Sequence, residues 1–154
     1  MRYLPGILVV QYVATLALGL LLRDLLAGPV DPEVLFGSRR LLSLLVAMPV
    51  LETVAIHMLV IEACATAGRG RSGALYVGAV LAAIVFFLLH VLAKSIFNGL
   101  VYGLTGGVAF SVMYVVARRD GRKAAFVATW LLHLSSNALL VLSIAYYGML
   151  LGVT

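Results

Sequence analysis

The sequence predicts an all-α membrane protein, a bundle of about five transmembrane helices in one integral-membrane domain covering residues 1–154. Of the 154 residues, 64% are hydrophobic and only 11% are charged, and the mean hydropathy is +1.14. A soluble domain of this length leaves much of its surface in water and has no place to hide so much apolar area. Long apolar runs separated by short polar loops are typical of a polytopic membrane protein.

Each of the five apolar runs is long enough to cross a bilayer, which takes about 20 residues of helix. The runs cover approximately 4–27, 41–65, 74–97, 98–117 and 124–151. The polar link 28–40 contains Pro29 and Pro32 and predicts a turn or a short interfacial helix. Asn98 and Gly99 predict the turn between the third and fourth runs, and Lys94 is the charged residue near it.

The basic residues predict the orientation of the chain in the membrane. With five spans, the N-terminus, the second loop and the fourth loop lie on one side. That side holds seven of the 11 basic residues: Arg2, Arg69, Arg71, Arg118, Arg119, Arg122 and Lys123. An excess of Lys and Arg marks the cytoplasmic side, so the N-terminus is expected in the cytoplasm. The net charge of +5 suits a lipid bilayer as partner, and the short basic loops do not predict a nucleic-acid partner.

Four polar residues lie inside the apolar runs, where a polar side chain is costly and marks a functional site by default. They are Glu52 in the second run, His90 in the third, and His133 with Asn137 in the fifth. His133 and Asn137 are four residues apart and share a helix face, as do Phe86 and His90. Glu52, His133 and Asn137 fall near the middle of antiparallel spans, and His90 joins that layer if its helix continues to Phe97.

A carboxylate, two imidazoles and an amide in one water-poor pocket support general acid–base chemistry. Glu52 can take a proton from a water molecule that one histidine positions. The other histidine, together with Asn137, can donate hydrogen bonds to an oxyanion. These roles fit acyl transfer to water, which is the hydrolysis of a peptide bond. The motif-bearing core of the chain is about 41–151.

The order of these residues resembles that of the CAAX protease and bacteriocin-processing family (CPBP, also called Abi). Its pattern is Glu-Glu-x-x-x-Arg, then Phe-x-x-x-His, then His-x-x-x-Asn or Asp, each on a membrane helix. Phe86 to His90 matches the second motif, His133 to Asn137 matches the third, and Glu52 matches the first glutamate. Phe-x-x-x-His is weak by itself, and the ordered set, which spans about residues 48–140, is more specific.

The resemblance implies an intramembrane endopeptidase like the type II CAAX prenyl endopeptidases and their bacterial relatives. The catalytic residues would be Glu52, His90, His133 and Asn137, with Thr53, His57 and Phe86 supporting them. It implies a prokaryotic cell membrane, no cofactor, and a peptide or a membrane protein as substrate. The sequence specifies no oligomeric state.

The first motif departs from the family pattern at two positions. Thr53 stands where the second glutamate belongs, and His57 stands where the arginine belongs. Positions 53 and 57 are four residues apart, so the family's glutamate and arginine can form an ion pair on one helix turn. This chain has neither partner of that possible pair. The departure favours an alternative function, a non-catalytic membrane scaffold or immunity protein that binds a peptide or a membrane partner.

Each candidate also has a less specific interpretation. Glu52, His90, His133 and Asn137 could each be a hydrogen-bond partner between membrane helices. Glu52, His90 and His133 could instead form a three-residue zinc site. Elsewhere, Glu62 is expected to pair at the surface near the basic loop of Arg69 and Arg71. Four glycines are expected to allow close helix packing: Gly99, Gly103, Gly106 and Gly107.

Overall fold

The computed structural model describes residues 3–26, 42–69 and 71–151, and over these ranges the regular structure is helical, with no strand. Five helices in this part of the chain are long and apolar enough to cross a membrane. These spans are Leu4–Leu22, Ser43–Ala67, Gly73–Ala93, Ile96–Asp120 and Arg122–Ser143. The predicted all-α membrane bundle is therefore confirmed. The predicted turn or interfacial helix in the link 28–40 lies outside the described residues.

Two of the five spans contain π-helical turns. The first span is α1 (Leu4–Leu26), the third is α6 (Ser72–Ala93) and the fifth is α9 (Arg122–Leu151). The second span is made of η1 (Ser43–Ala47), α4 (Met48–Glu52), η2 (Thr53–Met58) and α5 (Leu59–Ala67). The fourth is made of α7 (Ile96–Asn98), η3 (Gly99–Leu104), α8 (Thr105–Ala117) and η4 (Arg118–Asp120). In these, η1, η2 and η3 are π-helical and η4 is a 3₁₀ turn.

The end of the third helix corrects the sequence prediction. The helix was expected to continue to Phe97, with the turn at Asn98 and Gly99, but α6 ends at Ala93. Lys94 leaves the helical conformation and Ser95 is extended. The hydroxyl of Ser95 accepts a hydrogen bond from the backbone N–H of Asn98 at 3.2 Å and so caps the start of α7. Serine is a favoured helix N-cap, and the turn at Lys94 and Ser95 lies four residues before the predicted one.

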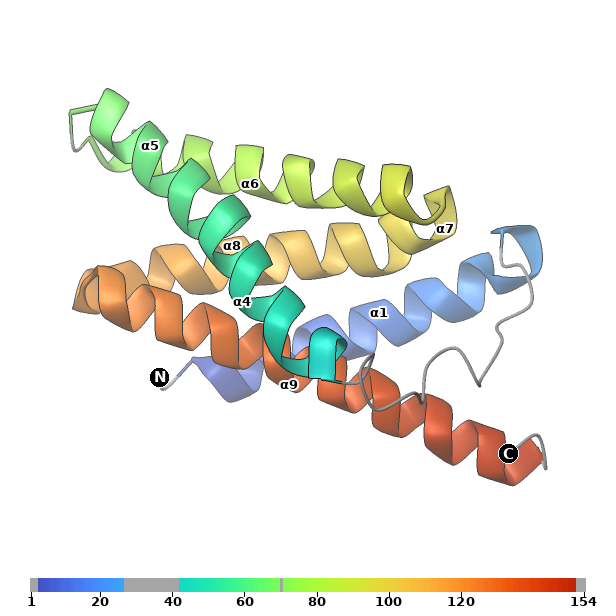
Figure 1. Ribbon diagram of the computed structural model, residues 1–154. Helices are drawn as coiled ribbons and strands as arrows, with labels where there is room; N and C mark the ends of the chain where they lie inside the picture. The colour runs from blue at the N-terminus through green and yellow to red at the C-terminus, as the bar shows by residue number, and fades with distance from the viewer. Residues whose placement is uncertain (1–2, 27–41, 70, 152–154) are drawn as a thin grey trace.

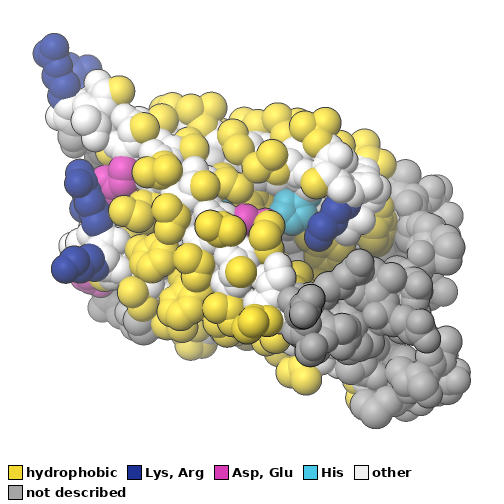
Figure 2. All heavy atoms as spheres, viewed as in Figure 1, with side chains coloured by type: hydrophobic (Ala, Val, Ile, Leu, Met, Phe, Trp, Pro, Cys, Tyr) yellow, Lys and Arg dark blue, Asp and Glu magenta, His cyan; other side chains and the backbone are white. Residues whose placement is uncertain are grey.

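Successive spans run in opposite directions, which places the two chain ends at opposite ends of the bundle (Figure 1). The α5–α6 turn and the η4 turn lie at the same end as the N-terminus (Figure 1). Lys and Arg side chains gather at this end, and hydrophobic side chains cover the middle of the molecule (Figure 2). This arrangement matches the distribution of charge that a membrane protein shows across a bilayer.

The fourth span lies at the centre of the bundle. More than half of it, 56%, is buried, compared with 6% of the first span. Gly103 and Gly107 let the fourth span approach α6 closely. A Cβ atom at position 103 would lie 3.0 Å from Cα of Phe87, and one at position 107 would lie 2.9 Å from the carbonyl oxygen of Ala83. The expected close packing at the glycines is therefore present, and it brings α6 with Phe86 and His90 against the bundle core.

Candidate active site

Glu52 and His133 meet between the second and fifth spans. The Oε2 atom of Glu52 lies 3.3 Å from Nε2 of His133. The His133 side chain is 4% exposed and the Glu52 side chain is 21% exposed. Glu52 ends α4 and His133 lies within α9, so the contact joins helices that are about 80 residues apart in the chain. The structure brings together two of the four predicted catalytic side chains in direct contact.

Two phenylalanines connect the three histidines of the chain into one aromatic cluster. Phe86 lies with its ring centroid 4.5 Å from that of His90, 5.3 Å from His57 and 5.7 Å from His133. Phe110 stacks on His133 at 4.1 Å and meets the edge of His57 at 5.6 Å. Phe86 is thus packed against every imidazole, and the two rings fix the positions of the histidines by contact on several sides.

His90 lies in the last turn of α6. Its Nδ1 is 3.0 Å from the backbone carbonyl oxygen of Phe86, which can only accept a hydrogen bond. Nδ1 therefore carries the proton, and in neutral His90 the Nε2 atom is left as an acceptor. His57 and His133 are buried, while His90 is half-buried. Figure 2 shows an acidic and a histidine side chain at the surface of the hydrophobic band.

Asn137 holds the fifth span against the start of the second. Its side-chain Nδ2 donates a hydrogen bond to the backbone carbonyl of Leu44, in η1, at 2.8 Å. An amide nitrogen has two N–H groups, so one donor remains for another acceptor. Asn137 lies one helical turn beyond His133 on the same side of α9, as its spacing predicts.

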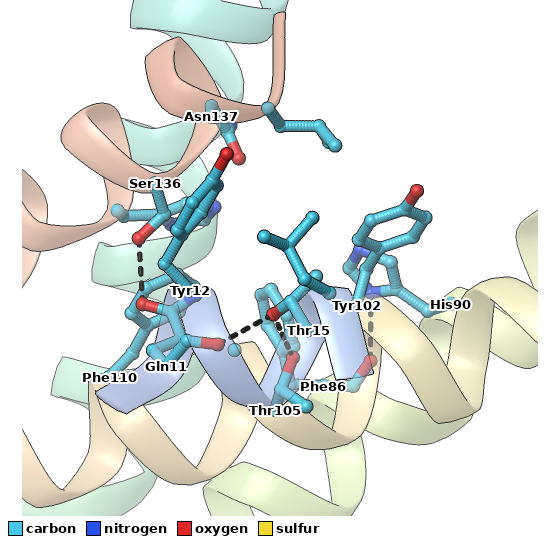
Figure 3. Close-up of a pocket in the computed structure, with 14 residues that line it drawn as sticks. Gln11, Tyr12, Thr15, Phe86, His90, Tyr102, Thr105, Phe110, Ser136 and Asn137 are labelled. Atoms are coloured by element: carbon cyan, nitrogen blue, oxygen red, sulfur yellow. Dashed lines mark hydrogen bonds between the residues drawn. The ribbon is translucent and has the colours of Figure 1, made fainter. Parts of the chain in front are cut away.

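A pocket of about 60 Å³ opens beside these residues, which is room for at least one water molecule. His90, His133 and Asn137 line it, together with Phe86 and Phe110. The other wall comes mainly from α1, the η3–α8 segment and α9 (Figure 3), and its polar side chains are those of Gln11, Tyr12, Thr15, Tyr102, Thr105 and Ser136. The structure thus gathers three predicted catalytic residues around one cavity, and the fourth, Glu52, contacts His133.

Hydrogen bonds fasten α1 over this pocket. The hydroxyl of Ser136 donates to Oε1 of Gln11 at 2.7 Å, and the hydroxyls of Thr15 and Thr105 are 2.9 Å apart (Figure 3). Gln11 is only 8% exposed. Gln11 was not predicted as a site residue, although it is an amide inside an apolar run, the same signal that indicates Asn137.

Thr53 and His57, which replace the family's glutamate and arginine, are both fully buried. Nδ1 of His57 lies 3.2 Å from the hydroxyl oxygen of Ser111, on α8. His57 also contacts the rings of Phe86 and Phe110, so it lies behind the pocket and away from the loops. Phe110 and Ser111 were missed by sequence reasoning, because an apolar run gives no sign of which of its residues face a histidine.

Glu62 forms ion pairs, as expected, and its partners are Arg118 and Arg122. Oε1 of Glu62 lies 2.5 Å from Nε of Arg118, and Oε2 lies 2.8 Å from Nε of Arg122. The hydroxyl of Tyr114 donates to Oε1 at 3.0 Å. These bonds tie the first turn of α5 to the turn between α8 and α9, because antiparallel packing places the two side by side.

The zinc alternative has no support in this geometry. Within the part of the chain that is described, no three His, Cys, Asp or Glu side chains are grouped closely enough to hold a metal ion. His90 turns Nδ1 to the Phe86 carbonyl, and the carboxylate of Glu52 contacts His133. Metal analysis of the protein after chelation distinguishes a zinc site from a metal-free glutamate–histidine pair.

The fold and the site define a class of protein: a polytopic membrane protein with a glutamate–histidine pair beside a small pocket inside its helix bundle. Comparison of the chain with family models, curated proteins and solved structures yields no match. The order of the motifs and the geometry of the residues are therefore the basis for assigning a function.

Proposed function

We propose that this protein is an intramembrane endopeptidase that hydrolyses a peptide bond with a water molecule activated by Glu52. The single observation that carries the proposal is the 3.3 Å contact of Glu52 with His133 next to a membrane-embedded pocket. A carboxylate is costly in a hydrocarbon layer, and a retained one marks a functional site by default. The resemblance to the CPBP family, in which the same residue types occur in the same order, supports the same function.

Glu52 acts as the general base in this proposal, and His90 positions the water. The unprotonated Nε2 of His90 accepts a hydrogen bond from the water, and the carboxylate takes the other proton as the oxygen attacks the peptide carbonyl carbon. Glu52 then returns this proton to the leaving amine nitrogen as the C–N bond breaks. One water molecule is consumed and the carboxylate is regenerated, so the cycle needs no further reactant.

His133 and Asn137 stabilise the oxyanion that forms when the water attacks. Nε2–H of His133 donates to Glu52 in the resting site and is released to the oxyanion once Glu52 has taken the proton from water, and the second N–H of the Asn137 amide is free of the bond to Leu44. Two donors one helical turn apart can contact the same oxygen, and their strength is greatest where water is excluded. The loss of one such donor typically lowers kcat by about 10²- to 10³-fold.

The substrate in this proposal is a peptide or a membrane-protein segment that enters from the bilayer. Hydroxyl and amide groups line the pocket, and these groups can bond the backbone of an extended chain that leaves its helix. The pocket of about 60 Å³ is much smaller than a peptide. Opening is therefore required, and α1, the least buried span, is the element that moves.

The test is cleavage of a membrane-peptide library by the purified protein, with Glu52→Gln as the variant. This change keeps the shape of the side chain and removes the base, so cleavage should fall by about 10²- to 10⁴-fold. Glu62→Gln is the matched control, because it removes a carboxylate outside the pocket. Cleavage that survives a chelator supports the glutamate mechanism, and equal cleavage by the wild type and Glu52→Gln contradicts it.

A second candidate function is a non-catalytic scaffold or immunity protein that binds a peptide or membrane partner. The observation that favours it is the replacement of the first motif's ion-pairing positions by Thr53 and His57, both fully buried. In this case the pocket binds its partner without turnover. Capture of library peptides by folded wild-type protein, with no cleavage of any captured peptide, would favour binding over hydrolysis.

A further inference from the structure

Behind the pocket, four buried polar side chains each have one atom without a hydrogen-bond partner. These atoms are Oγ1 of Thr53, Nε2 of His57, Oγ1 of Thr129 and Nδ1 of His133. We call these four residues the buried polar cluster. Their exposed fractions are 0% for the first three and 3% for His133. A buried polar group without a partner costs free energy, so native structures rarely keep one, and four together require an explanation.

The cluster belongs to two helical segments that pack together. Thr53 and His57 lie one turn apart on η2, and Thr129 and His133 lie one turn apart on α9. The η2 segment packs against α9. The rings of His57 and His133 both contact Phe86 and Phe110, which places the two imidazoles around the same pair of aromatic rings.

The chemistry of the four atoms is complementary. A threonine hydroxyl donates one hydrogen bond and accepts others, and a neutral imidazole nitrogen either donates or accepts. Nε2 of His133 faces the carboxylate of Glu52, which only accepts, so Nε2 carries the proton and Nδ1 is an acceptor in neutral His133. Nδ1 therefore requires a donor, and buried water commonly supplies such bonds to otherwise unsatisfied polar groups.

We infer that the buried polar cluster binds internal water that links η2 to α9 and fixes the tautomer of His133. The ligand is water, and Thr53, His57 and Thr129 are positioning residues that act through it. This network occupies the place of the ion pair that the resembling family has in its first motif. The inference of bound water depends on the proposed function at one point, which is the catalytic role of His133.

The test replaces each threonine by valine, which has nearly the same shape and lacks the hydroxyl, in protein reconstituted into nanodiscs. Nitrogen-15 NMR of histidine side chains reads the tautomer of His133 without any need for cleavage. We expect Thr129→Val and Thr53→Val to shift the Nδ1 resonance of His133 and to lower the thermal unfolding midpoint. Thr129→Ser, which keeps the hydroxyl, should restore both.

The control is Thr66→Val, because this exposed hydroxyl bonds the Glu62 carbonyl of its own helix at 2.8 Å. It should leave the His133 resonances unchanged. A raised unfolding midpoint in the cluster variants would mean that the hydroxyls have no partner, and would overturn the inference. A lowered midpoint with unchanged His133 resonances would mean that the threonine hydroxyls bond the backbone of their own helices, and this result would also overturn the inference. An inactive wild type with the expected NMR shifts would overturn the protease proposal and leave the water network standing.

Discussion

At the scale of single residues, three polar side chains of the site contact partners on other helices. Glu52 contacts His133, Asn137 bonds the carbonyl of Leu44, and His57 bonds Ser111. Such contacts compensate for the cost of placing polar groups in hydrocarbon. The same residues that form the site therefore also hold the spans in register, and their substitution affects both stability and chemistry.

Asn137→Leu separates these two effects. The variant loses the hydrogen bond to the Leu44 carbonyl and the spare amide donor that faces the pocket. A hydrogen bond between membrane helices contributes about 0.6 to 2 kcal/mol. We expect the free energy of unfolding in mild detergent to fall by this amount, and cleavage of a responsive peptide to fall by about 10²-fold or more. Cleavage reduced only in proportion to the unfolded fraction would contradict the oxyanion role of Asn137.

Sequence reasoning identified Glu52, His90, His133 and Asn137 because a polar group in an apolar run is conspicuous. Three of these line the pocket, and the fourth is in contact with His133. The partners of Glu62 could not be found in this way. Arg118 and Arg122 are more than 50 residues away, and their contact depends on how antiparallel helices are paired and rotated, which local spacing does not specify.

At the scale of elements, the π-helical turns lie next to the site. The η2 segment begins directly after Glu52 and carries Thr53 and His57, and η3 carries Gly103, which packs against His90. A π-helical turn changes the direction in which the following side chains project, and such turns are frequent at functional sites. They let the second span present Glu52 and His57 to the same aromatic cluster.

The sequence does not reveal these turns or the early end of α6. Hydrophobic periodicity is similar for α-helical and π-helical turns, so the apolar run 41–65 predicts one continuous helix. The end at Ala93 depends on the capping bond of Ser95 to Asn98. A serine inside an apolar run is a weak signal, because its hydroxyl can equally bond its own helix, as that of Ser143 does.

The closure of the pocket by α1 gives a prediction at this scale. Cysteines in place of Thr15 and Thr105, whose hydroxyls are 2.9 Å apart, should form a disulfide that fixes α1 to α8. The background is Cys64→Ser, which removes the one native cysteine. If substrate enters past α1, the oxidised protein loses most of its cleavage and a reducing agent restores it. Full cleavage by the crosslinked protein would show that peptides reach the pocket by another path.

At the scale of the whole molecule, five antiparallel spans place the basic loops and the N-terminus at one end (Figures 1 and 2). The number of spans and their approximate limits were predictable, because each needs a long apolar run with a break on either side. The relative placement of the spans could not be predicted, because it depends on close contacts at glycines such as that of Gly107 with Ala83.

The positive-inside rule predicts that this basic end faces the cytoplasm. Single cysteines at Asp120 and at Lys94, in the Cys64→Ser background, probe the two ends, since both positions are exposed. In intact cells, a membrane-impermeant maleimide should label the cysteine at position 94 and not the one at position 120. In inverted vesicles the labelling should be exchanged. The reverse pattern would contradict the proposed orientation.

The measurement that tests the central claim most directly is a double-mutant cycle on cleavage with Glu52→Gln and His133→Gln. Residues that act as one unit have strongly non-additive effects on rate. We predict that each single variant loses about 10²- to 10⁴-fold in kcat and that the double variant loses little more than either. Losses that multiply in the double variant, or a single variant that cleaves as fast as the wild type, would contradict a glutamate–histidine pair acting in one active site.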